Sequence, residues 1–424
     1  MITAVVGVNW GDEGKGRMVD LLSESSHIVA RCQGGNNAGH TVVNERGKFV
    51  LNLLPSGILR EDTKNVMGPG MVVDLEHLAG ETGRLREQGV AITPFNLLIS
   101  DRATICLPFH RLLDGLEEDR LAAHKQGSTR RGIAPVYADK FMRKALRMSD
   151  LCHPDSLYEK VRALVEWKNL TLRGYGPENE ATADSVYHWL RRYGEPLVPY
   201  IRNVTSYLND AIDGGANVLL ELQLGALRDI DFGIYPYTSS STTLAAGAPI
   251  GAGIPNRRAE QVVGVMKAYS TCVGGGPFVC EFSGAEAEAL REAGGEYGAA
   301  TGRPRRVGGF DIPASRYGAL LQGVTDLALT KLDVLSGMEK LPVCVAYEVD
   351  GVRTQDFPTG DELERAKPVY EYLPGFSGDI SGCRRFIDLP EAARRYVRLL
   401  EEAVRRPIRW VSVGAGREQY LELD

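Results

Sequence analysis

Three glycines, two carboxylates and a lysine follow the first apolar run of the chain. Ile2–Val8 leads into Asn9-Trp-Gly-Asp-Glu-Gly-Lys-Gly-Arg17, and an apolar helical pattern comes next. A strand, a glycine turn and a helix N-terminus together offer free backbone N–H groups to an anion, so the pattern predicts a phosphate site. It is not a Walker A motif, because Gly16 stands where a Ser or Thr would bind magnesium. The alternative is a strand-to-helix turn that only requires glycine.

A second glycine-rich segment follows the second apolar run. Ile28–Cys32 is followed by Gln33-Gly-Gly-Asn-Asn-Ala-Gly-His-Thr41. In open α/β sheets the loops beyond the carboxyl ends of the strands carry ligands. A lone histidine is more often structural than catalytic, but His40 lies in a loop that we expect beside the phosphate site. The two loops together predict that Asp12 and His40 flank a phosphate.

Short apolar runs alternate with helical patterns along the chain. They are Ile2–Val8, Ile28–Cys32, Asn96–Ser100, Val218–Leu222, Val262–Ala268, Leu327–Leu332, Val343–Val349 and Ile408–Val413. Helices are predicted between them, for example Leu75–Gln88 and Pro390–Val404. This alternation predicts an α/β fold similar to that of P-loop NTPases, with a large, mostly parallel sheet covered by helices. Residues 108–213 are helix after helix, and we interpret them as a mainly helical insertion in a single domain, 1–424.

Composition excludes several classes of protein. The chain has 424 residues, with 49 Lys plus Arg and 55 Asp plus Glu, and a formal charge of −6. A mildly acidic total argues against nucleic acid or an anionic membrane as the main partner. No apolar run reaches the roughly 18 residues of a membrane span, and no basic segment precedes an apolar stretch at the N-terminus. Neither a membrane span nor a secretory signal is therefore expected.

Cysteine and histidine are scattered. The seven cysteines include no CxxC pair and the seven histidines no HExxH motif. We therefore expect reduced thiols in a cytoplasmic protein, and neither a disulfide framework nor a metal held by Cys or His. A metal held by carboxylate and phosphate oxygens stays open.

The two glycine loops together resemble the paired signatures of the adenylosuccinate synthetase family. Further segments match the family in order: Pro55–Arg60, Arg131–Tyr137, Asp229–Tyr237, Ala268–Ser270, Thr301–Arg306, Thr330–Leu335 and Val411–Gly414. The resemblance spans nearly the whole chain. It implies a ligase that uses GTP and Mg²⁺ to join L-aspartate to C6 of inosine 5′-monophosphate (IMP). The products are adenylosuccinate, GDP and phosphate, formed through a 6-phosphoryl intermediate.

The resemblance gives the chemistry to a few groups in the two loops. Asp12 would take the N1 proton of the base and contact Mg²⁺, and the Gly39 carbonyl would complete the magnesium shell. His40 would stabilise charge on the transferring phosphoryl group. Lys15 and the backbone of Gly14–Arg17 would hold phosphates.

Thr330-Lys-Leu-Asp333 resembles the guanine-reading motif of GTP-binding proteins. A carboxylate at Asp333 accepts from guanine N1–H and the 2-amino group, a pair that adenine lacks, so GTP is favoured over ATP. Ser412–Gly414 would close over the base. The residues that the resemblance implies for GTP are Gly11, Glu13, Gly14, Gly16, Arg17, Gly39, Thr41, Arg305, Lys331, Leu332, Asp333, Ser412, Val413 and Gly414.

A basic segment matches the family's aspartate-binding loop. Its residues are Ala299, Ala300, Thr301, Gly302, Arg303 and Arg305. Arginine suits this task because a guanidinium grips a carboxylate in two places, although a solvated basic turn is the ordinary interpretation.

The resemblance also implies contacts to the acceptor nucleotide. These residues are Asn37, Ala38, Thr129, Arg143, Leu224, Ser239 and Arg303. Thr129 and Arg143 match positions that bind its 5′-phosphate. In the family that arginine comes from the partner subunit, so we expect a homodimer with shared active sites.

The chain departs from the family beside the acceptor base. Glu221-Leu-Gln-Leu-Gly225 stands where the family reads E-G-A-Q-G, so Leu224 replaces a glutamine that helps to hold the purine 6-oxygen. Gln223 is expected to face the opposite side, because successive strand residues alternate. Other departures are Asn36 for His, Arg130 for Gly, Ser239 for Thr, Thr242 for Asn, Ala300 for Thr and Cys272 for Arg. The residues kept are Asp12, Lys15, Asn37, His40, Arg303, Arg305 and Asp333.

Three hypotheses follow. The first is an ordinary adenylosuccinate synthetase with a repacked pocket. The second is a specialised paralogue that aminates a modified purine-like nucleotide, such as a formycin-type C-nucleotide or a 2-aminopurine nucleotide, in a nucleoside natural-product pathway. The third is a GTP-binding regulatory protein without turnover, and the retained Asp12 and His40 weigh against it.

Overall fold

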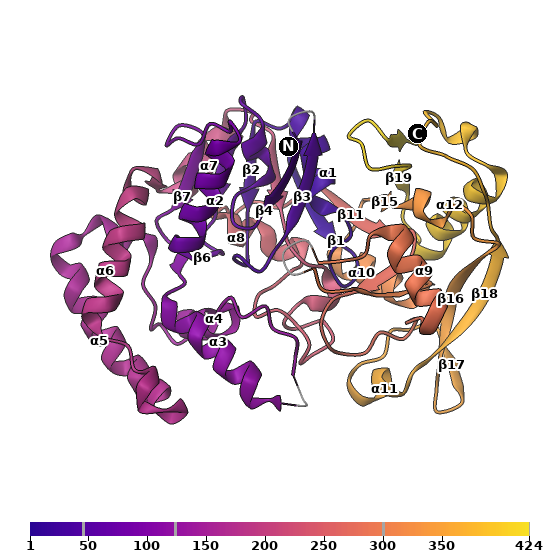
Figure 1. Ribbon diagram of the computed structural model, residues 1–424. Helices are drawn as coiled ribbons and strands as arrows, with labels where there is room; N and C mark the ends of the chain where they lie inside the picture. Colours follow the sequence, from indigo (N-terminus) through magenta and orange to yellow (C-terminus); the bar gives the residue numbers. More distant parts are fainter. Residues whose placement is uncertain (45–46, 123–124, 299–301, 424) are drawn as a thin grey trace.

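The computed structural model describes residues 1–44, 47–122, 125–298 and 302–423. Within them, ten strands form one central sheet in the order β20-β19-β15-β11-β1-β10-β2-β5-β7-β9 (Figure 1). Their bounds are β1 Ile2–Gly7, β2 Ile28–Arg31, β5 Lys64–Met67, β7 Leu97–Ser100, β9 Ile201–Arg202, β10 Val218–Glu221, β11 Gln261–Lys267, β15 Asp326–Thr330, β19 Ile408–Ser412 and β20 Tyr420–Glu422.

The sheet is parallel except at one edge. The central strand β1 pairs in parallel with β10 on one side, where Ile2 faces Val218, and with β11 on the other, where Thr3 faces Gln261. Only the pairing of β19 with β20 is antiparallel within this described sheet. The prediction of a large, mostly parallel sheet is confirmed.

Alternate residues of β1 pack against different helices. Ala4 and Val6 belong to a core cluster that also holds residues of α7, α8, α10 and α12, whereas Val5 packs with Met18 and Val19 of α1. Helices therefore cover both faces, which is why the strands are continuous apolar runs. The α-helices described are α1 Lys15–Leu22, α2 Leu75–Glu87, α3 Pro108–Arg120, α4 Ile133–Phe141, α5 Pro154–Leu172, α6 Ala183–Gly194, α7 Val204–Asp213, α8 Ala248–Ala252, α9 Gly284–Gly294, α10 Ile312–Gln322, α11 Gly360–Arg365 and α12 Glu391–Val404.

Helices α3 to α7 and the short strand β9 occupy residues 108–213. Figure 1 shows α5 and α6 at one end of the molecule, beyond β7. Leu164 of α5 and Leu190 of α6 share a core cluster with Leu97 and Ile99 of β7, so the helices pack on that edge of the sheet. Their being an insertion in a single domain stays a prediction.

A second sheet lies at the other end of the molecule (Figure 1). It contains β14 Phe310–Asp311, β16 Lys340–Val349, β17 Val352–Thr354 and β18 Lys367–Pro374. The predicted strand Val343–Val349 lies in β16 and pairs antiparallel with β17 and β18, outside the main sheet. Shorter pairs are β3 His40–Asn44 with β4 Gly47–Leu51, β6 Val72–Val73 with β8 Thr104–Ile105, and β12 Ser270–Cys272 with β13 Arg306–Gly308. Among the described helices, none has the length and apolar character that crossing a membrane requires.

The parallel strands place the chemistry-bearing loops at one edge of the sheet. The carboxyl ends of β1, β2, β10, β11, β15 and β19 all point the same way. The two glycine loops and residues 222–225 follow β1, β2 and β10. The guanine-type motif and Ser412–Gly414 begin at the last residues of β15 and β19. This edge is where ligands bind in open α/β sheets.

Candidate active site

A buried carboxylate fastens the loop after β1. Glu13 accepts hydrogen bonds from the backbone N–H of Asn9 at 3.2 Å and of Gly11 at 2.8 Å, and Lys15 Nζ lies 2.6 Å from its Oε2. Helix α1 begins at Lys15, directly after Gly14, so the N–H groups of its first turn have no partner within the helix. The loop is thus held rigid with a helix N-terminus at its mouth, the arrangement that binds phosphate.

The second glycine loop packs directly on this helix. A Cβ built at Gly16 would lie only 2.9 Å from the Cβ of His40, so glycine is needed for the two segments to approach. The structure therefore brings His40 against the first turn of α1, and the charge of Lys15 acts on the imidazole.

His40 is oriented by Glu221, the last residue of β10. The ring Nδ1 hydrogen-bonds to Glu221 Oε1, and Ser56 donates its N–H and its hydroxyl to the same carboxylate, both at 2.7 Å. Burial opposes ionisation of Glu221, but His40, Arg31 and Ser56 hold the pKa of Glu221 below its ordinary value. An ionised carboxylate only accepts, so Nδ1 carries a proton and the opposite nitrogen, Nε2, is left for a ligand.

Asp12 is paired with an arginine of the predicted aspartate loop. Arg305 Nε donates to Asp12 Oδ2 at 3.0 Å, and Arg305 Nη1 donates to Glu296 Oε2 at 2.7 Å. The Asp12 side chain is 37% exposed, so its carboxylate is accessible from the mouth of the site. Two segments almost 300 residues apart therefore meet at the predicted catalytic carboxylate.

The guanine-type motif is bonded to the phosphate-type loop. Thr330 Oγ1 donates to the backbone carbonyl of Glu13 at 2.6 Å. Lys331 has φ 60°, and the 3₁₀ turn Leu332–Leu335 follows it. Burial raises the pKa of Asp333, while Lys331 and Arg17 oppose the rise. The motif is therefore placed to face the base of a nucleotide whose phosphates lie at the N-terminus of α1.

Arg17 ties the loop after β19 to α1. Its Nη1 donates to Ser412 Oγ at 2.9 Å and to the Gly414 carbonyl at 2.5 Å, and its guanidinium lies 4.3 Å from the ring centroid of Tyr420. The predicted residues Ser412–Gly414 thus lie beside the guanine-type motif, since β15 and β19 are neighbours in the sheet.

Gln223 and Leu224 lie against different glycine loops. Gln223 Nε2 donates to Asn37 Oδ1 at 3.0 Å, and Arg31 donates to Gln223 Oε1 at 2.7 Å. A Cβ built at Gly34 would lie 1.3 Å from Gln223 Nε2, so this amide fills the space that only glycine leaves. The expectation that Gln223 and Leu224 face apart holds, but its strand-based reason is wrong, because β10 ends at Glu221.

Leu224 packs over the first glycine loop in a strained conformation. Its φ is 63°, which is unusual for a leucine, and its Cδ2 would lie 3.7 Å from a Cβ at Gly11, next to Asp12. The side chain is partly exposed. An apolar group therefore stands beside the predicted catalytic carboxylate.

The remaining nucleotide contacts surround a turn at Val273–Gly276. Gly275 N–H donates to the Gln126 carbonyl at 3.3 Å, which brings the Thr129 segment to this turn. Arg303 Nη1 would lie 3.6 Å from a Cβ at Gly127. Ser239 Oγ is buried with no hydrogen-bond partner among the described residues, which leaves it free for a ligand.

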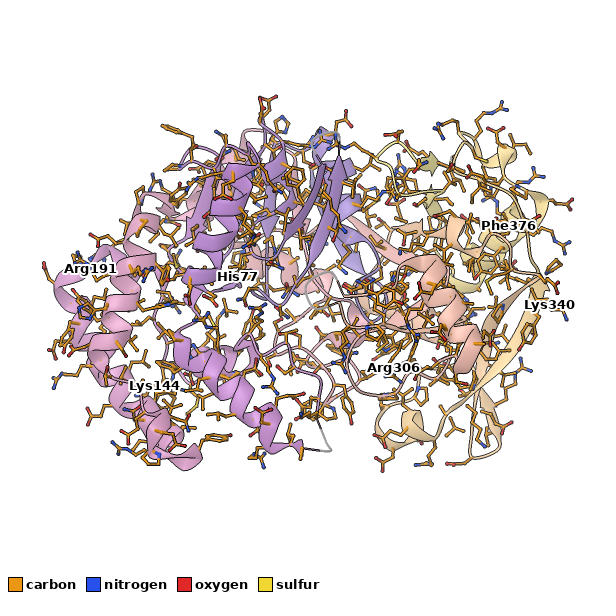
Figure 2. The ribbon with its side chains drawn as sticks, in the orientation of Figure 1. His77, Lys144, Arg191, Arg306, Lys340 and Phe376 are labelled. Atoms are coloured by element: carbon orange, nitrogen blue, oxygen red, sulfur yellow. The ribbon has the colours of Figure 1, made fainter. Side chains whose placement is uncertain are left out.

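Two predicted groups are not brought into this assembly. Arg143 is exposed just after α4 with φ 60°. Figure 2 shows its neighbour Lys144 on the α3–α5 side of the molecule, well apart from Arg306, which follows Arg305. Part of the predicted aspartate loop, Ala299, Ala300 and Thr301, lies outside the described residues. The described part of the loop begins at Gly302 and contains Arg303 and Arg305.

Comparison with known proteins decides the family. The family model described as adenylosuccinate synthetase matches residues 4–421. The chain belongs to the adenylosuccinate synthetase family. The adenylosuccinate synthetase of Halothermothrix orenii is 44% identical over 421 residues, and that of Streptomyces griseus subsp. griseus is 46% identical over 421 residues. Each alignment covers 99% of this chain and 98% of the relative.

A solved structure of the same family matches the fold of this chain. The fully ligated adenylosuccinate synthetase from Plasmodium falciparum matches with a TM-score of 0.92 at 35% identity, covering 100% of this chain and 99% of that one. A cyanophage S-2L succinoaminodeoxyadenylate synthetase matches with a TM-score of 0.60 at 18% identity, covering 99% and 95%, which shows a shared fold alone. As a member of the adenylosuccinate synthetase family, the protein is a GTP-dependent ligase that forms a carbon–nitrogen bond. The family's reaction, which joins L-aspartate to IMP with GTP, agrees with this family membership and with the structural match.

Several departures from the adenylosuccinate synthetase pattern have local structural partners. Asn36 Nδ2 donates to Asp74 Oδ2 at 3.1 Å, and Asp74 caps α2. Thr242 Oγ1 donates to Asp229 Oδ2 at 2.9 Å. Arg130 has φ 56°, a conformation that suits the family's glycine better. These three differences concern packing and loop conformation.

The departure at Cys272 is accompanied by a nearby arginine. Arg228 Nη2 lies 3.1 Å from the buried Cys272 sulfur and also donates to the Val273 carbonyl at 2.5 Å. A guanidinium thus still lies beside the position where adenylosuccinate synthetases carry an arginine, although it comes from another part of the chain.

Sequence reasoning missed the buried groups behind the site. Glu221 opens the segment Glu221–Gly225 at the end of a predicted strand, and this position of a carboxylate is a signal that the sequence does offer. Glu296 and Lys267 belong to no motif, and only the fold brings them to Arg305.

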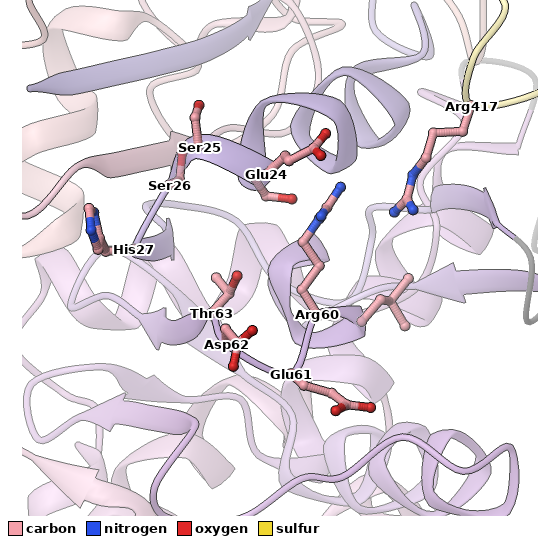
Figure 3. Close-up of a pocket in the computed structure, with 11 residues that line it drawn as sticks. Glu24, Ser25, Ser26, His27, Arg60, Glu61, Asp62, Thr63 and Arg417 are labelled. Carbon is pink, nitrogen blue, oxygen red and sulfur yellow. The ribbon is translucent and has the colours of Figure 1, made fainter.

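A cavity of about 470 Å³ lies away from this site (Figure 3). It is lined by His27 and Thr63, which precede β2 and β5, and by Arg60 and Arg417, which both contact Asp20. It therefore opens at the amino ends of the strands, opposite the glycine loops, and is not the candidate active site.

Proposed function

We propose that the chain joins L-aspartate to C6 of IMP by way of a 6-phosphoryl intermediate, with the groups of the two glycine loops as its catalytic machinery. The observation that carries this proposal is the contact of His40 with the first turn of α1, beside a loop that also presents Asp12. The guanine-type motif is bonded to the same loop. A phosphate donor, an acceptor base and the two catalytic side chains can therefore share one space.

The first step activates the 6-oxygen of the base. Asp12 takes the N1 proton, electron density moves to O6, and O6 attacks the γ-phosphorus of GTP with loss of GDP. Arg305 holds the Asp12 carboxylate from one side, which leaves its exposed edge for the base. In the second step the aspartate amine attacks C6, phosphate leaves, and the amine gives up a proton.

His40 stabilises the phosphoryl group through Nε2. Because Nδ1–H is bound by Glu221, Nε2 donates only when the ring carries both protons. Burial holds the pKa of His40 below its ordinary value, and the contact with Glu221 offsets only part of that fall. An incoming phosphate favours the doubly protonated ring, so the charge appears where the transition state needs it.

Mg²⁺ is the expected metal, held by the Asp12 carboxylate and the Gly39 carbonyl. Hard oxygen donors suit this ion, which commonly takes only one or two protein ligands and completes its shell with phosphate oxygens and water. Both residues are at least partly exposed at the site. In the described chain no group of three or more His, Cys, Asp or Glu side chains could hold a metal alone, which fits a site shared with a nucleotide. When bound, the ion would neutralise phosphate charge.

We further propose that the protein is a homodimer in which Arg143 reaches the partner's nucleotide site. Phe141 and Met142, directly before Arg143, are 77% and 57% exposed. Adjacent large apolar side chains at a surface are typical of a protein interface. A cytoplasmic location accords with seven unpaired cysteines.

The second candidate function is the same amination on a modified purine-like nucleotide. Leu224 supports it, because an apolar side chain beside Asp12 offers no donor to the 6-oxygen of IMP. A formycin-type C-nucleotide or a 2-aminopurine nucleotide would be the acceptor.

One assay separates these functions. The purified protein is incubated with GTP, L-aspartate, MgCl₂ and one acceptor, and phosphate release and product mass are measured. Turnover of IMP that requires every substrate supports the first function, and turnover of an analogue but not of IMP supports the second. If no acceptor in the assay leads to phosphate release, the result contradicts both functions and favours a GTP-binding protein without ligase activity.

A further inference from the structure

Glu296 is a fully buried carboxylate that joins three segments of the site. It lies just beyond α9 and is 0% exposed. Burying an isolated carboxylate is very unfavourable, so its partners must compensate the charge. Those partners come from β11, from the predicted aspartate loop and from the guanine-type motif.

The first partner anchors the carboxylate to the sheet. Lys267, the last residue of β11, donates from Nζ to both oxygens of Glu296 at 2.9 Å and to Thr271 Oγ1 at 2.9 Å. Tyr269 donates its hydroxyl to Glu296 Oε1. Both belong to the buried framework, so they fix Glu296 in place.

The other two partners belong to the predicted ligand sites. Arg305 Nη1 donates to Glu296 Oε2 at 2.7 Å, and its backbone N–H donates to the Glu296 carbonyl at 2.9 Å. Lys331 Nζ lies 3.3 Å from Glu296 Oε1 and also donates to the Gly294 carbonyl. One carboxylate thus holds the arginine that faces Asp12 and the lysine of the guanine-type motif.

The charges leave this cluster able to take anions. Lys267, Arg305 and Lys331 are cations, whereas Glu296 and Asp12 are the anions that they contact. A guanidinium has five N–H groups. Among the described residues, the Arg305 side chain donates one of these to Asp12 and one to Glu296. The others can donate to the carboxylate of a ligand.

We propose that Glu296 is a positioning residue that couples the guanine site to the aspartate site. A guanine nucleotide that orders Lys331 also orders Glu296, and Glu296 then holds Arg305 in the orientation that a carboxylate ligand requires. The second ligand loses less conformational freedom, so each ligand strengthens the binding of the other. The proposal rests on the proposed function, because it takes Lys331 and Arg305 as ligand contacts.

The test measures coupling without turnover. Calorimetry gives the dissociation constant of GDP with and without saturating L-aspartate, with Mg²⁺ present and no acceptor nucleotide. In the wild-type chain we expect aspartate to tighten GDP binding by about 5- to 10-fold, and GDP to tighten aspartate binding by the same factor. In Glu296→Gln the amide replaces one acceptor by a donor facing Lys267 or Arg305, and we expect the factor to fall to about one.

Tyr269→Phe is the matched control. It removes a hydrogen bond to the same carboxylate and leaves the ion pairs of Glu296 with Lys267, Arg305 and Lys331, so it should lower the melting temperature and keep the coupling. Lys331→Gln removes the ion pair between Lys331 and Glu296 at a side chain that is 35% exposed, so no unpaired charge is buried. It replaces Glu296→Gln in the test if that variant does not fold. It should keep aspartate binding alone but lose its enhancement by GDP.

Coupling that survives in folded Glu296→Gln or in Lys331→Gln overturns the proposal, as does its absence from the wild-type chain. Equal loss of coupling in Tyr269→Phe also overturns it, because the effect would then be general loosening. A wild-type chain that binds neither GDP nor aspartate overturns the proposed function itself, and that result is visible before any coupling is measured.

Discussion

Glu221, the last residue of β10, binds the Nδ1 atom of His40, the first residue of β3, across 181 positions of sequence. Ser56 donates two hydrogen bonds to the same carboxylate, and Arg31 adds its charge. The imidazole is therefore held in one orientation with Nε2 directed away from the carboxylate. A carboxylate that orients a histidine also stabilises the imidazolium form, as in other carboxylate–histidine pairs.

Glu221→Gln should therefore reduce kcat by about 10²- to 10⁴-fold, because the amide neither fixes the Nδ1 proton nor stabilises the charged ring. KM for GTP should change little, since Glu221 is behind the histidine. Ser56→Ala is the control, and its smaller effect would show that the charge matters more than the hydrogen bond. Steady-state kinetics with a melting curve for each variant decide the matter. An unchanged kcat in folded Glu221→Gln would mean that His40 needs no partner.

Asp12→Asn and His40→Asn should each abolish detectable turnover, with losses of at least about 10³-fold in kcat. Asparagine has the shape of aspartate and is smaller than histidine, so neither change adds bulk or charge, and the guanine-type motif is untouched. GDP should therefore bind within a few-fold of the wild-type affinity. Calorimetry with GDP and a phosphate-release assay give the two readouts. Comparable turnover in either variant would contradict the assigned role.

Much of the fold was predictable because its strands are buried on both faces. The apolar runs Val218–Leu222 and Ile408–Val413 coincide with β10 and β19 to within one residue. By contrast β5, Lys64–Met67, is short and begins with Lys and Asn, so its sequence resembles a loop. The run Val343–Val349 is apolar like the others, and nothing local indicates that it belongs to a second, antiparallel sheet.

The candidate site also contains residues that the sequence predicts and residues that only the fold reveals. Asp12 and His40 were predictable because glycine loops after strands carry a chemical signature. Glu296 was not, because its importance comes from contacts with residues 267, 305 and 331, which only the fold brings together. The orientation of Leu224 depends on a positive φ beyond the end of β10, which strand alternation does not predict.

Asp311 should make stability depend on pH. It is a buried carboxylate that accepts from Ala314 N–H at 3.0 Å and from Tyr347 OH at 2.7 Å, and burial raises the pKa of Asp311 to about 6. A folded-state pKa above the unfolded value of 3.8 gives stability that is full below pH 3.8 and is lost as pH rises through about 6. Asparagine resembles the protonated acid and does not titrate.

Between pH 7 and pH 4.5, the difference in unfolding free energy between the wild-type chain and Asp311→Asn should therefore shift by about 2 kcal/mol in favour of the wild type. Urea denaturation at the two pH values measures it. A difference that is the same at both pH values would show that the folded-state pKa of Asp311 is ordinary.

Leu224→Gln should raise kcat/KM for IMP, by about tenfold or more if the new amide reaches the 6-oxygen, because a donor to a developing oxyanion contributes a few kcal/mol. Leu224→Met is the control, since it changes shape without adding a donor. The same two variants are assayed with the modified purine-like acceptors. If the wild-type chain acts on such an acceptor, the glutamine should lower that activity. No gain on IMP would show that Leu224 does not set acceptor choice.

Shared active sites make a prediction that needs no structure of the dimer. In an Arg143→Leu chain every site lacks the partner's arginine, and in an Asp12→Asn chain every site lacks its base, so each homodimer should be nearly inactive. Mixing equal amounts under exchange conditions makes half of the dimers hybrid. In a hybrid, the site with an intact Asp12 receives Arg143 from the other subunit, while the second site lacks both. Activity should therefore recover to about a quarter of the wild-type value.

Mixing Asp12→Asn with His40→Asn is the control, because those two residues belong to one subunit's site and no hybrid site is complete. Equal recovery in both mixtures, or none in the first, would contradict the sharing of Arg143.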